Sequence, residues 1–518
     1  MRKIRILWAD DEIDLLKPHI LLLEQKGYEV ETALSGDEAI QMVDESDYDV
    51  IFLDENMPGL TGLEALAEIK RNKPSIPIVM ITKSEEEYLM DDAIGSQITD
   101  YLIKPVNPKQ IILSLKKIVD SSRLISERVT SNYRQGFMEL SSRVNDNLNF
   151  DEWKTLYKDL VYWELELNKS NEESMQEILL TQKQEANNNF GKYITNNYED
   201  WIADPDDSPV MSYNLFAKKV APYIRRGERP TVLLVIDNLR FDQWKFLESS
   251  INEMFRVVKE DLYCAILPTA TQYARNSIFA GLMPLDIQKR FGKLWLNDDE
   301  EGGKNMNEAA FLQDLLKRLR LDIRFSYEKI VRQEAGKALA DNAKNLVESN
   351  ELTVIVYNFI DMLSHARTDM EVIKELAEDE AAYRSITSSW FEHSPLKDIL
   401  GVLSEQDINL IITTDHGSIR VKRPVQIVGD KNTTTNLRYK MGRNLGYNYK
   451  DVIEFRQPER VKLPKSNISS VYVMSKPEDY FVYPNNQNYY VNFYRDTFQH
   501  GGVSLEEMMV PVIELTGK

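Results

Sequence analysis

Cysteine and long apolar runs are scarce in this chain of 518 residues. The single cysteine, Cys264, has no partner within the chain, which excludes an internal disulfide and a cluster of thiolate metal ligands. No apolar run approaches the roughly 20 residues that a membrane-spanning helix needs. The first residues reach an acidic cluster after a short apolar stretch, which does not fit a signal peptide. We therefore expect a protein of the reducing cytoplasm, without membrane insertion.

Positive charge is also in deficit. The chain has 63 Lys and Arg against 83 Asp and Glu, so its formal net charge is −20. Charge alone therefore does not draw the whole chain to DNA or to anionic membranes, and a transcription factor that binds DNA directly is disfavoured. The apolar fraction of 42% is typical of folded domains, and at about 100 to 200 residues per domain the length suggests three or four of them.

Short apolar runs and amphipathic segments alternate through the first 120 residues, 1–120, which we expect to form the first domain. The predicted strands are 4–9, 28–33, 48–54, 76–82 and 98–103. The segments between them predict helices, including the polar stretch 85–94. Because a crossover helix can cover each face of such a sheet, the order predicts a doubly wound, flavodoxin-like parallel sheet.

The rest of the chain predicts two further parts. Residues 121–204 have no strand-like alternation, which indicates a helical bundle that acts as a linker, and the prolines in 204–210 end it. Beyond it, continuous β-rich runs predict strands buried on both faces, at 231–236, 353–359 and 408–413. We expect a large three-layer α/β domain over residues 205–518.

Polar side chains follow the predicted strands of residues 1–120. Asp10 and Asp11 end the first strand, and Asp54 ends the third. Thr82 ends the fourth, and Lys104 follows the fifth. Carboxyl ends of parallel strands share one edge, so the three carboxylates can bind Mg²⁺ while Asp54 accepts a phosphoryl group. One such residue alone would indicate only a solvated strand end, but five at the expected edges favour a site.

The string LDENMPGLTG surrounds Asp54, Tyr101 lies in the fifth predicted strand, and Lys104 precedes a proline. In these features, residues 1–120 resemble a response-regulator receiver domain. The resemblance implies that a sensor histidine kinase is the phosphodonor. It also implies that phosphorylation of Asp54 repositions Thr82 and Tyr101. We expect phosphorylation to promote a homodimer, with the helical linker transmitting the change.

The three long apolar runs of the C-terminal part each lead into metal-binding residue types. These residues are Asp237 after the first run, Asp361 and His365 after the second, Asp415 and His416 after the third, and His500 near the C-terminus. Mixed nitrogen and oxygen ligands suit Zn²⁺ best, with Mn²⁺ or Fe²⁺ as lesser options. Two metals about 3.5 to 4 Å apart can support an in-line phosphoryl displacement.

Such chemistry needs a nucleophile, and LPTATQYARNSIFAG offers Thr269 and Thr271 at the start of a predicted helix. Thr271 is the candidate catalytic nucleophile, and the alternative is that it serves only as a helix N-cap.

This residue set is similar to the alkaline phosphatase superfamily, and the strings PTATQYAR, TTDHG and HGGVSLEEMMVP resemble its PglZ branch over about residues 205–515. The resemblance implies two zinc ions, one held by Asp237, Thr271, Asp415 and His416, and the other by Asp361, His365 and His500. A sulfatase is not indicated, because Cys264 lacks the proline and arginine that follow a sulfatase nucleophile.

Receiver, helical linker and PglZ domain together resemble the PorX-type response regulators. The resemblance implies a phosphodiesterase-like output acting on cyclic or short linear oligonucleotides. It also implies a role in type IX protein secretion, with secretion-machinery or transcription-factor partners. The alternative is a signalling scaffold with a structural zinc domain, whose output is phosphorylation-dependent partner binding.

A basic stretch follows the Asp415–His416 motif. Residues 420–465 contain 12 Lys and Arg against 4 Asp and Glu, with aromatic residues between them. Arg438, Tyr439 and Lys440 are candidates to bind an anionic, base-containing substrate. A solvated basic face is the alternative, and both interpretations stay open.

Overall fold

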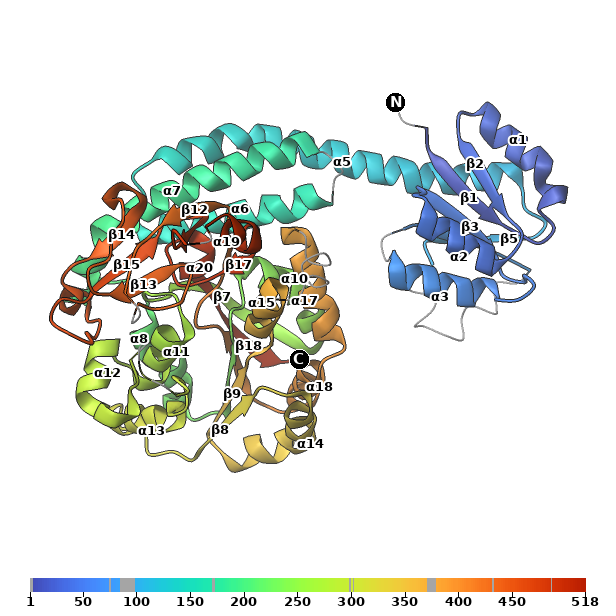
Figure 1. Ribbon diagram of the computed structural model, residues 1–518. Coiled ribbons are helices and arrows are strands. Elements are labelled where there is room, and N and C mark those ends of the chain that lie inside the picture. The colour runs from blue at the N-terminus through green and yellow to red at the C-terminus, as the bar shows by residue number, and fades with distance from the viewer. Residues whose placement is uncertain are drawn as a thin grey trace. The chain divides into compact units, whose positions relative to one another are not determined.

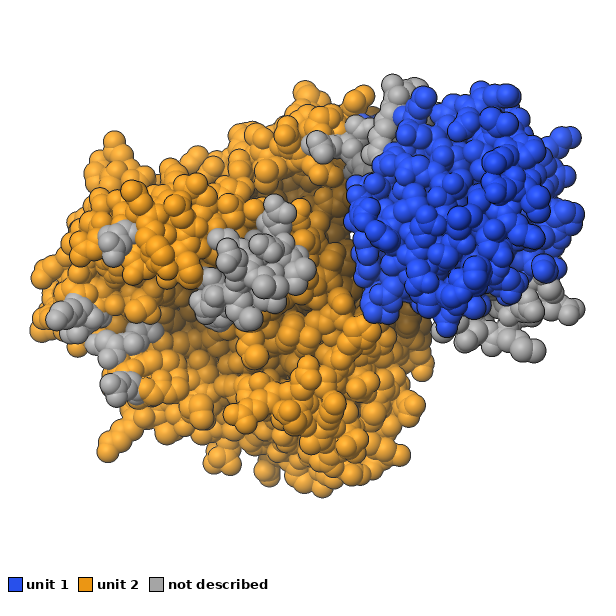
Figure 2. Space-filling view, turned by 45° about the vertical axis from the view of Figure 1, so that its right-hand side comes forward, with its two compact units in different colours: residues 1–133, 169–172 blue, residues 134–168, 173–518 orange. Residues whose placement is uncertain are grey.

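The computed structural model describes residues 3–73, 76–83, 98–169, 173–297, 300, 302–369, 379–430, 433–485 and 487–518. Within these ranges the side chains of 119–128, 173 and 365–369 are not described. The chain forms two compact units, one of residues 1–133 and 169–172 and one of residues 134–168 and 173–518 (Figure 2). Across the described ranges, no helix is both long enough and apolar enough to cross a bilayer.

The first unit is built on a parallel five-stranded sheet of order β2-β1-β3-β4-β5. Its strands are β1 (Arg5–Ala9), β2 (Glu29–Ala33), β3 (Val50–Asp54), β4 (Ile78–Thr82) and β5 (Asp100–Ile103). Its helical segments before α5 are η1 (Ile13–Leu16), α1 (Lys17–Gln25), α2 (Gly36–Glu45) and α3 (Gly62–Asn72). This confirms the predicted doubly wound fold, while the predicted helix at 85–94 falls in the undescribed gap between 83 and 98.

Both faces of this sheet are covered, which explains why its three inner strands, β1, β3 and β4, are apolar over most of their length. Leu7 and Ile51 belong to the hydrophobic core on one face, whereas Ile6 and Phe52 belong to the core on the other. Since successive side chains of a strand point to opposite faces, only a continuous apolar run can fill both cores.

Gly62 begins α3 where this helix passes close to β3. A Cβ atom at this position would lie 2.1 Å from the main-chain oxygen of Asp54. Gly62→Ala must therefore push α3 away from β3, and we expect it to lower the free energy of unfolding of the first unit by about 1–3 kcal/mol. Hydrogen exchange of the β3 amides in increasing urea measures this change.

The control for this substitution is Arg71→Ala, on the exposed side of the same helix. We expect it to change the free energy of unfolding by less than about 0.5 kcal/mol. Equal losses in the two variants would contradict the steric argument.

Three long helices form the predicted helical linker: α5 (Pro108–Asn145), α6 (Phe150–Asn168) and α7 (Glu173–Ala203). Helix α5 continues through residue 120, where we predicted the first domain to end, so the receiver and the linker share one helix. Helices α6 and α7 belong to the second compact unit. The functional division into 1–120, 121–204 and 205–518 remains our prediction.

A six-stranded mixed sheet of order β7-β18-β10-β6-β9-β8 is the centre of the second unit. Its strands are β6 (Thr231–Ile236), β7 (Phe255–Cys264), β8 (Phe325–Ile330), β9 (Leu352–Tyr357), β10 (Asn409–Thr413) and β18 (Met509–Gly517). The three strands expected from apolar runs, β10, β6 and β9, are parallel neighbours. Strand β18 pairs antiparallel with both β10 and β7.

Helices cover both sides of this sheet (Figure 1). One side carries α11 (Thr271–Ala280), α12 (Pro284–Phe291) and α13 (Glu308–Arg318), and the other carries α10 (Phe241–Met254), α14 (Gln333–Ser349), α17 (Glu380–Glu392) and α18 (Pro395–Ser404). The predicted large α/β domain is confirmed.

The chain between β10 and β18 forms three small sheets. They pair β11 (Ile419–Arg420) with β17 (Phe498–Gln499), β12 (Arg423–Gln426) with β16 (Asp479–Val482), and β15 (Val471–Ser475) with β13 (Tyr439–Gly442) and β14 (Val452–Phe455). The remaining short helical segments are α8 (Ser212–Leu215), η3 (Phe216–Val220), α9 (Ala221–Arg226), η4 (Gly292–Leu294), α15 (Phe359–Asp369), η5 (Tyr449–Asp451), η6 (Pro458–Val461), α19 (Gln487–Tyr494) and α20 (Leu505–Met508).

Candidate functional site

The carboxyl ends of β1 and β3 bring Asp10, Asp11 and Asp54 together, with one oxygen of each within 4.8 Å of the others. Lys104 Nζ lies 2.8 Å from Oδ1 of Asp54 and 3.2 Å from Oδ2 of Asp10. Burial raises the pKa of Asp54, and the neighbouring Asp10 adds to this while Lys104 opposes it. Three carboxylates at one edge fit Mg²⁺, which prefers oxygen ligands and would favour their charged forms.

The predicted switch residues lie on β4, the strand next to Asp54, and on β5, the strand beyond it. Thr82 ends β4, and its hydroxyl donates to Oε2 of Glu55 at 2.6 Å. Tyr101 lies in β5, where its side chain is 48% exposed. Glu55 was not among the predicted site residues, although its position directly after Asp54 was the signal that could have found it.

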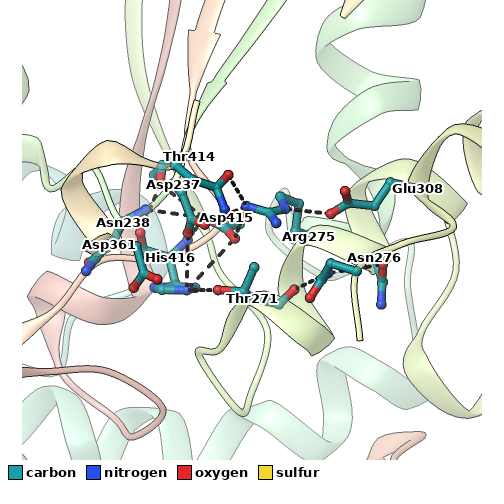
Figure 3. A network of polar contacts seen from close by, with 12 residues as sticks. Asp237, Asn238, Thr271, Arg275, Asn276, Glu308, Asp361, Thr414, Asp415 and His416 are labelled. Carbon is teal, nitrogen blue, oxygen red and sulfur yellow. Dashed lines mark hydrogen bonds and ion pairs between the residues drawn. The ribbon is translucent and has the colours of Figure 1, made fainter. Parts of the chain in front are cut away.

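In the second unit, β6 and β10 end side by side and bring Asp237, Asp415 and His416 together in a fully buried group (Figure 3). His416 Nε2 lies 3.8 Å from Oδ1 of Asp237 and 3.8 Å from Oδ2 of Asp415. Neither of these carboxylate oxygens accepts a hydrogen bond from any described residue. Buried oxygens without donors are costly, so a cation among these ligands fits the group.

The two carboxylates differ in their affinity for protons. Burial raises the pKa of Asp237 well above its usual range, and the nearby Asp415 adds to this effect. Burial acts on Asp415 in the same direction, but interactions with His416 and Arg275 hold its pKa below the usual value. A bound metal would supply the positive charge that keeps both ionised.

Main-chain carbonyls orient two of the three imidazoles that were predicted to bind metal. His416 Nδ1 lies 3.1 Å from the oxygen of Gly417, and His500 Nδ1 lies 3.1 Å from the oxygen of Thr269. Because a carbonyl oxygen only accepts, Nδ1 is the donor in each of these contacts, which leaves Nε2 as the ring nitrogen that could bind a metal. The two rings stack with their centroids 4.2 Å apart.

The second predicted metal group is brought together in part. Asp361 lies in the first turn of α15, and its Oδ1 is 3.5 Å from Nε2 of His500. His365 follows one turn later in α15, but its side chain is not among those described.

Thr271 is the first residue of α11, and its Oγ1 lies 3.0 Å from Nε2 of His416 (Figure 3). The N-cap of α11 is Ala270 rather than Thr271. Two ligands of one tetrahedral zinc lie about 3.3 Å apart, so the spacing is compatible with Thr271 and His416 sharing an ion.

A buried arginine of this site was missed in the sequence. Arg275 lies one turn after Thr271 in α11, and its guanidinium is 2.6 Å from Oδ2 of Asp237 and 2.6 Å from Oε1 of Glu308. Tyr327 Oη and Lys329 Nζ hold the other oxygen of Glu308, at 2.6 and 2.9 Å. The i, i+4 spacing from Thr271 puts Arg275 on the same helix face, which was the available signal.

Two of the residues predicted to bind substrate, Arg438 and Lys440, are buried. Arg438 is fully buried, and its five donors are held by Glu507 and by main-chain oxygens of Lys476, Asp479 and Val503. Lys440 is 1% exposed and donates to the main-chain oxygen of Thr434. Neither of these two cations is therefore exposed to contact an anionic substrate.

Burial lowers the pKa of Lys440 to about 7. The unfolded chain keeps this proton up to about pH 10.4, so between pH 7 and 10 it binds more protons than the folded protein. The free energy of unfolding should therefore rise with pH in this window, by about 1–3 kcal/mol from this group. Lys440→Met should flatten the rise in urea midpoints measured at pH 7, 8 and 9.

The exposed Lys450 of the same region supplies the control. Lys450→Met should keep the pH dependence of the wild type. Parallel curves for wild type and Lys440→Met would contradict the prediction.

The family described as the BREX system PglZ alkaline phosphatase-like domain matches residues 215–515. The PorX response regulator linker domain matches residues 123–202, and the response regulator receiver domain matches residues 6–116. The chain belongs to the PglZ family and is a PorX-type response regulator.

Curated relatives resemble part of this chain. The transcriptional regulatory protein ResD of Bacillus subtilis is 36% identical over 115 residues, which is 22% of this chain and 48% of ResD. The CpxR homolog of Haemophilus influenzae is 36% identical over 129 residues, 24% of this chain and 55% of that protein. The chain thus spans about half the length of the curated relatives it matches.

Similar solved structures include chemotaxis response regulator CheY4 of Vibrio cholerae, at 32% identity and a TM-score of 0.21, covering 23% of this chain and 99% of CheY4. Another is TrrA of Thermotoga maritima in complex with Mg²⁺ and BeF, at 31% identity and a TM-score of 0.21, covering 22% and 98%.

Proposed function

We propose that the PglZ domain is a two-zinc phosphodiesterase acting on cyclic or short linear oligonucleotides, controlled by phosphorylation of Asp54. The observation that carries the proposal is the buried group of Asp237, Asp415 and His416 with the Thr271 hydroxyl 3.0 Å from the imidazole. We further propose that this protein acts in the cytoplasm in the regulation of type IX secretion. Its proposed partners are a sensor histidine kinase, a second copy after phosphorylation, and a secretion-machinery component or transcription factor.

The metal ligands divide into two sets. One zinc would be held by Asp237, Thr271, Asp415 and His416, and the other by Asp361, His365 and His500. When bound, the ions would supply positive charge that lowers the pKa of a hydroxyl and stabilises charge on phosphoryl oxygens. Arg275 supports the first set, because it holds the second oxygen of Asp237 and so orients the first.

The reaction would proceed through Thr271. Its oxygen attacks phosphorus, one P–O ester bond breaks, and the leaving oxygen takes up a proton. Water then hydrolyses the threonyl phosphate ester, which frees the hydroxyl for the next cycle. Hydrolysis of one diester thus consumes one water and yields an alcohol and a phosphomonoester.

Tyr439 was predicted to bind a base-containing substrate, but its side chain is only 5% exposed. Its ring lies against the loop that carries His500, since a Cβ at Gly501 would lie 2.6 Å from Cδ1 of Tyr439. It also contacts Tyr273 edge to face, with the centroids 5.8 Å apart. Tyr273 is only 1% exposed, so neither ring presents an open face on which a nucleobase could stack.

The test compares the full-length protein after chelation with the same protein reloaded with zinc. We expect about two zinc ions per chain, and hydrolysis of bis(p-nitrophenyl) phosphate and of cyclic dinucleotides only in the reloaded protein. A zinc-loaded protein that hydrolyses no diester, but binds a partner once Asp54 is phosphorylated, would instead indicate the signalling scaffold.

A further inference from the structure

We propose that Lys183 and Asn187 of the linker helix α7 are positioning residues of the metal site, acting through Glu506 on the loop that carries His416. This inference rests on the proposed function, because it assigns the linker a part in holding the metal ligands. Helices α6 and α7 lie side by side in the second compact unit, so their contacts with the PglZ domain are internal to that unit (Figure 1).

Asn187 binds both the side chain and the main chain of α20, the short helix that follows His500. Its Nδ2 donates to Oε2 of Glu506 at 3.0 Å, and its Oδ1 accepts from the main-chain N–H of Leu505 at 2.8 Å. Asn187 and Glu506 are each 3% exposed. Losing one partner at this depth leaves a buried polar group unsatisfied, so the two bonds fix α20 against α7.

Lys183 holds the other oxygen of the same carboxylate. Its Nζ lies 3.1 Å from Oε1 of Glu506 and 2.8 Å from Oε2 of Glu164 in α6. Glu164 also accepts from Arg384, which donates to Asp242 at 2.9 Å. The two linker helices are thus joined to each other and to the PglZ domain by one buried network.

Glu506 in turn lies against the residue that follows His416. A Cβ at Gly417 would lie 2.1 Å from the main-chain oxygen of Glu506, and Gly417 N–H donates to the main-chain oxygen of Glu507 at 3.2 Å. The oxygen of Gly417 is the acceptor that fixes His416 Nδ1. Any displacement of α20 must therefore move Gly417 and the acceptor that orients His416. Groups that orient a ligating imidazole set its metal affinity.

The neighbouring residue of α7 offers a matched comparison. Gln184 also bonds to the PglZ domain, donating to the carboxylate of Glu478 at 3.2 and 3.4 Å. Glu478 lies just before β16, and its carboxylate is also bound by Lys422 at 2.8 Å. A general loosening of α7 would therefore follow from a change at Gln184 as well, whereas a specific effect on His416 would not.

The experiment measures zinc affinity of the full-length protein by competition with a chromophoric chelator, and kcat and KM for bis(p-nitrophenyl) phosphate. Asn187→Leu and Lys183→Met should weaken zinc binding and lower kcat by about 10- to 100-fold, with KM little changed. Lys183→Arg and Gln184→Leu should each stay within about threefold of wild type. In a Glu506→Gln background the effect of Lys183→Met should shrink, because the charged partner is gone.

Two comparisons decide the outcome. Wild-type zinc affinity in both Asn187→Leu and Lys183→Met, or an equal loss in Gln184→Leu, would overturn the inference while leaving the proposed function intact. A wild-type protein that takes up no zinc would overturn the proposed function, and the positioning role with it. If Asn187→Leu does not fold, the contrast between Lys183→Met and Lys183→Arg, each checked by thermal unfolding, carries the test.

Discussion

Replacing Thr271 with valine should lower the rate of phosphodiester hydrolysis by at least about 10³-fold while the protein keeps its zinc. Valine has nearly the shape of threonine but no hydroxyl, so the oxygen 3.0 Å from Nε2 of His416 is lost. Asp237, Asp415 and His416 remain in place to hold a metal. Initial rates on bis(p-nitrophenyl) phosphate, with zinc content measured on the same samples, give the result.

Thr271→Ser is the control for this change, because it keeps the hydroxyl and loses only a methyl group. We expect its rate to stay within about tenfold of wild type. Hydrolysis by Thr271→Val at the wild-type rate would show that the nucleophile is another group, such as water, and that Thr271 only lines the site.

Replacing Asp54 with asparagine should abolish phosphorylation by acetyl phosphate. In the wild type, Lys104 Nζ lies 2.8 Å from Oδ1 of Asp54. The amide of asparagine is nearly isosteric with the carboxylate and keeps an oxygen at this place, but it is a poor nucleophile toward phosphorus. Intact-mass measurement detects the phosphoryl group directly. Beryllofluoride should increase the sedimentation coefficient of the wild type and leave that of the variant unchanged.

Glu55→Gln is the matched control, because it changes the adjacent residue and still offers Thr82 a hydrogen-bond acceptor. This variant should gain one phosphoryl group as the wild type does. A phosphorylated Asp54→Asn protein would move the phosphoacceptor to another carboxylate, and an unchanged wild-type sedimentation coefficient would contradict the proposed homodimer.

The position of a residue in the fold could be predicted where it is determined mainly by the strand that the residue follows. Asp10, Asp54, Asp237 and Asp415 each follow an apolar run, and runs buried on both faces belong to parallel sheets whose carboxyl ends share an edge. Local pattern therefore predicted both the fold class and the carboxylates at the strand ends, because the hydrophobic effect acts on every residue of such a strand.

The position of a side chain could not be predicted from the sequence where it is determined by partners far along the chain. The basic stretch 420–465 was compatible with an exposed substrate surface, yet Arg438 turns inward to Glu507 and Lys440 is buried beneath Tyr483, 4.9 Å from its ring centroid. A count of charges does not reveal which of them a distant carboxylate will pair. For the same reason, the ion pair between Arg275 and Glu308 was not predicted from the sequence.

The sequence by itself determined the strands of the first unit, three of the six strands of the second unit's central sheet, the helical linker and the identity of the residues at the ends of those strands. These features follow from periodicity and short-range chemistry. Only the tertiary structure decided that Thr271 meets His416, that α5 continues from the receiver into the linker, and that Asn187 holds Glu506. Those pairings join segments of the chain that are distant in sequence, and they depend on the packing of whole helices against sheets, which no local pattern encodes.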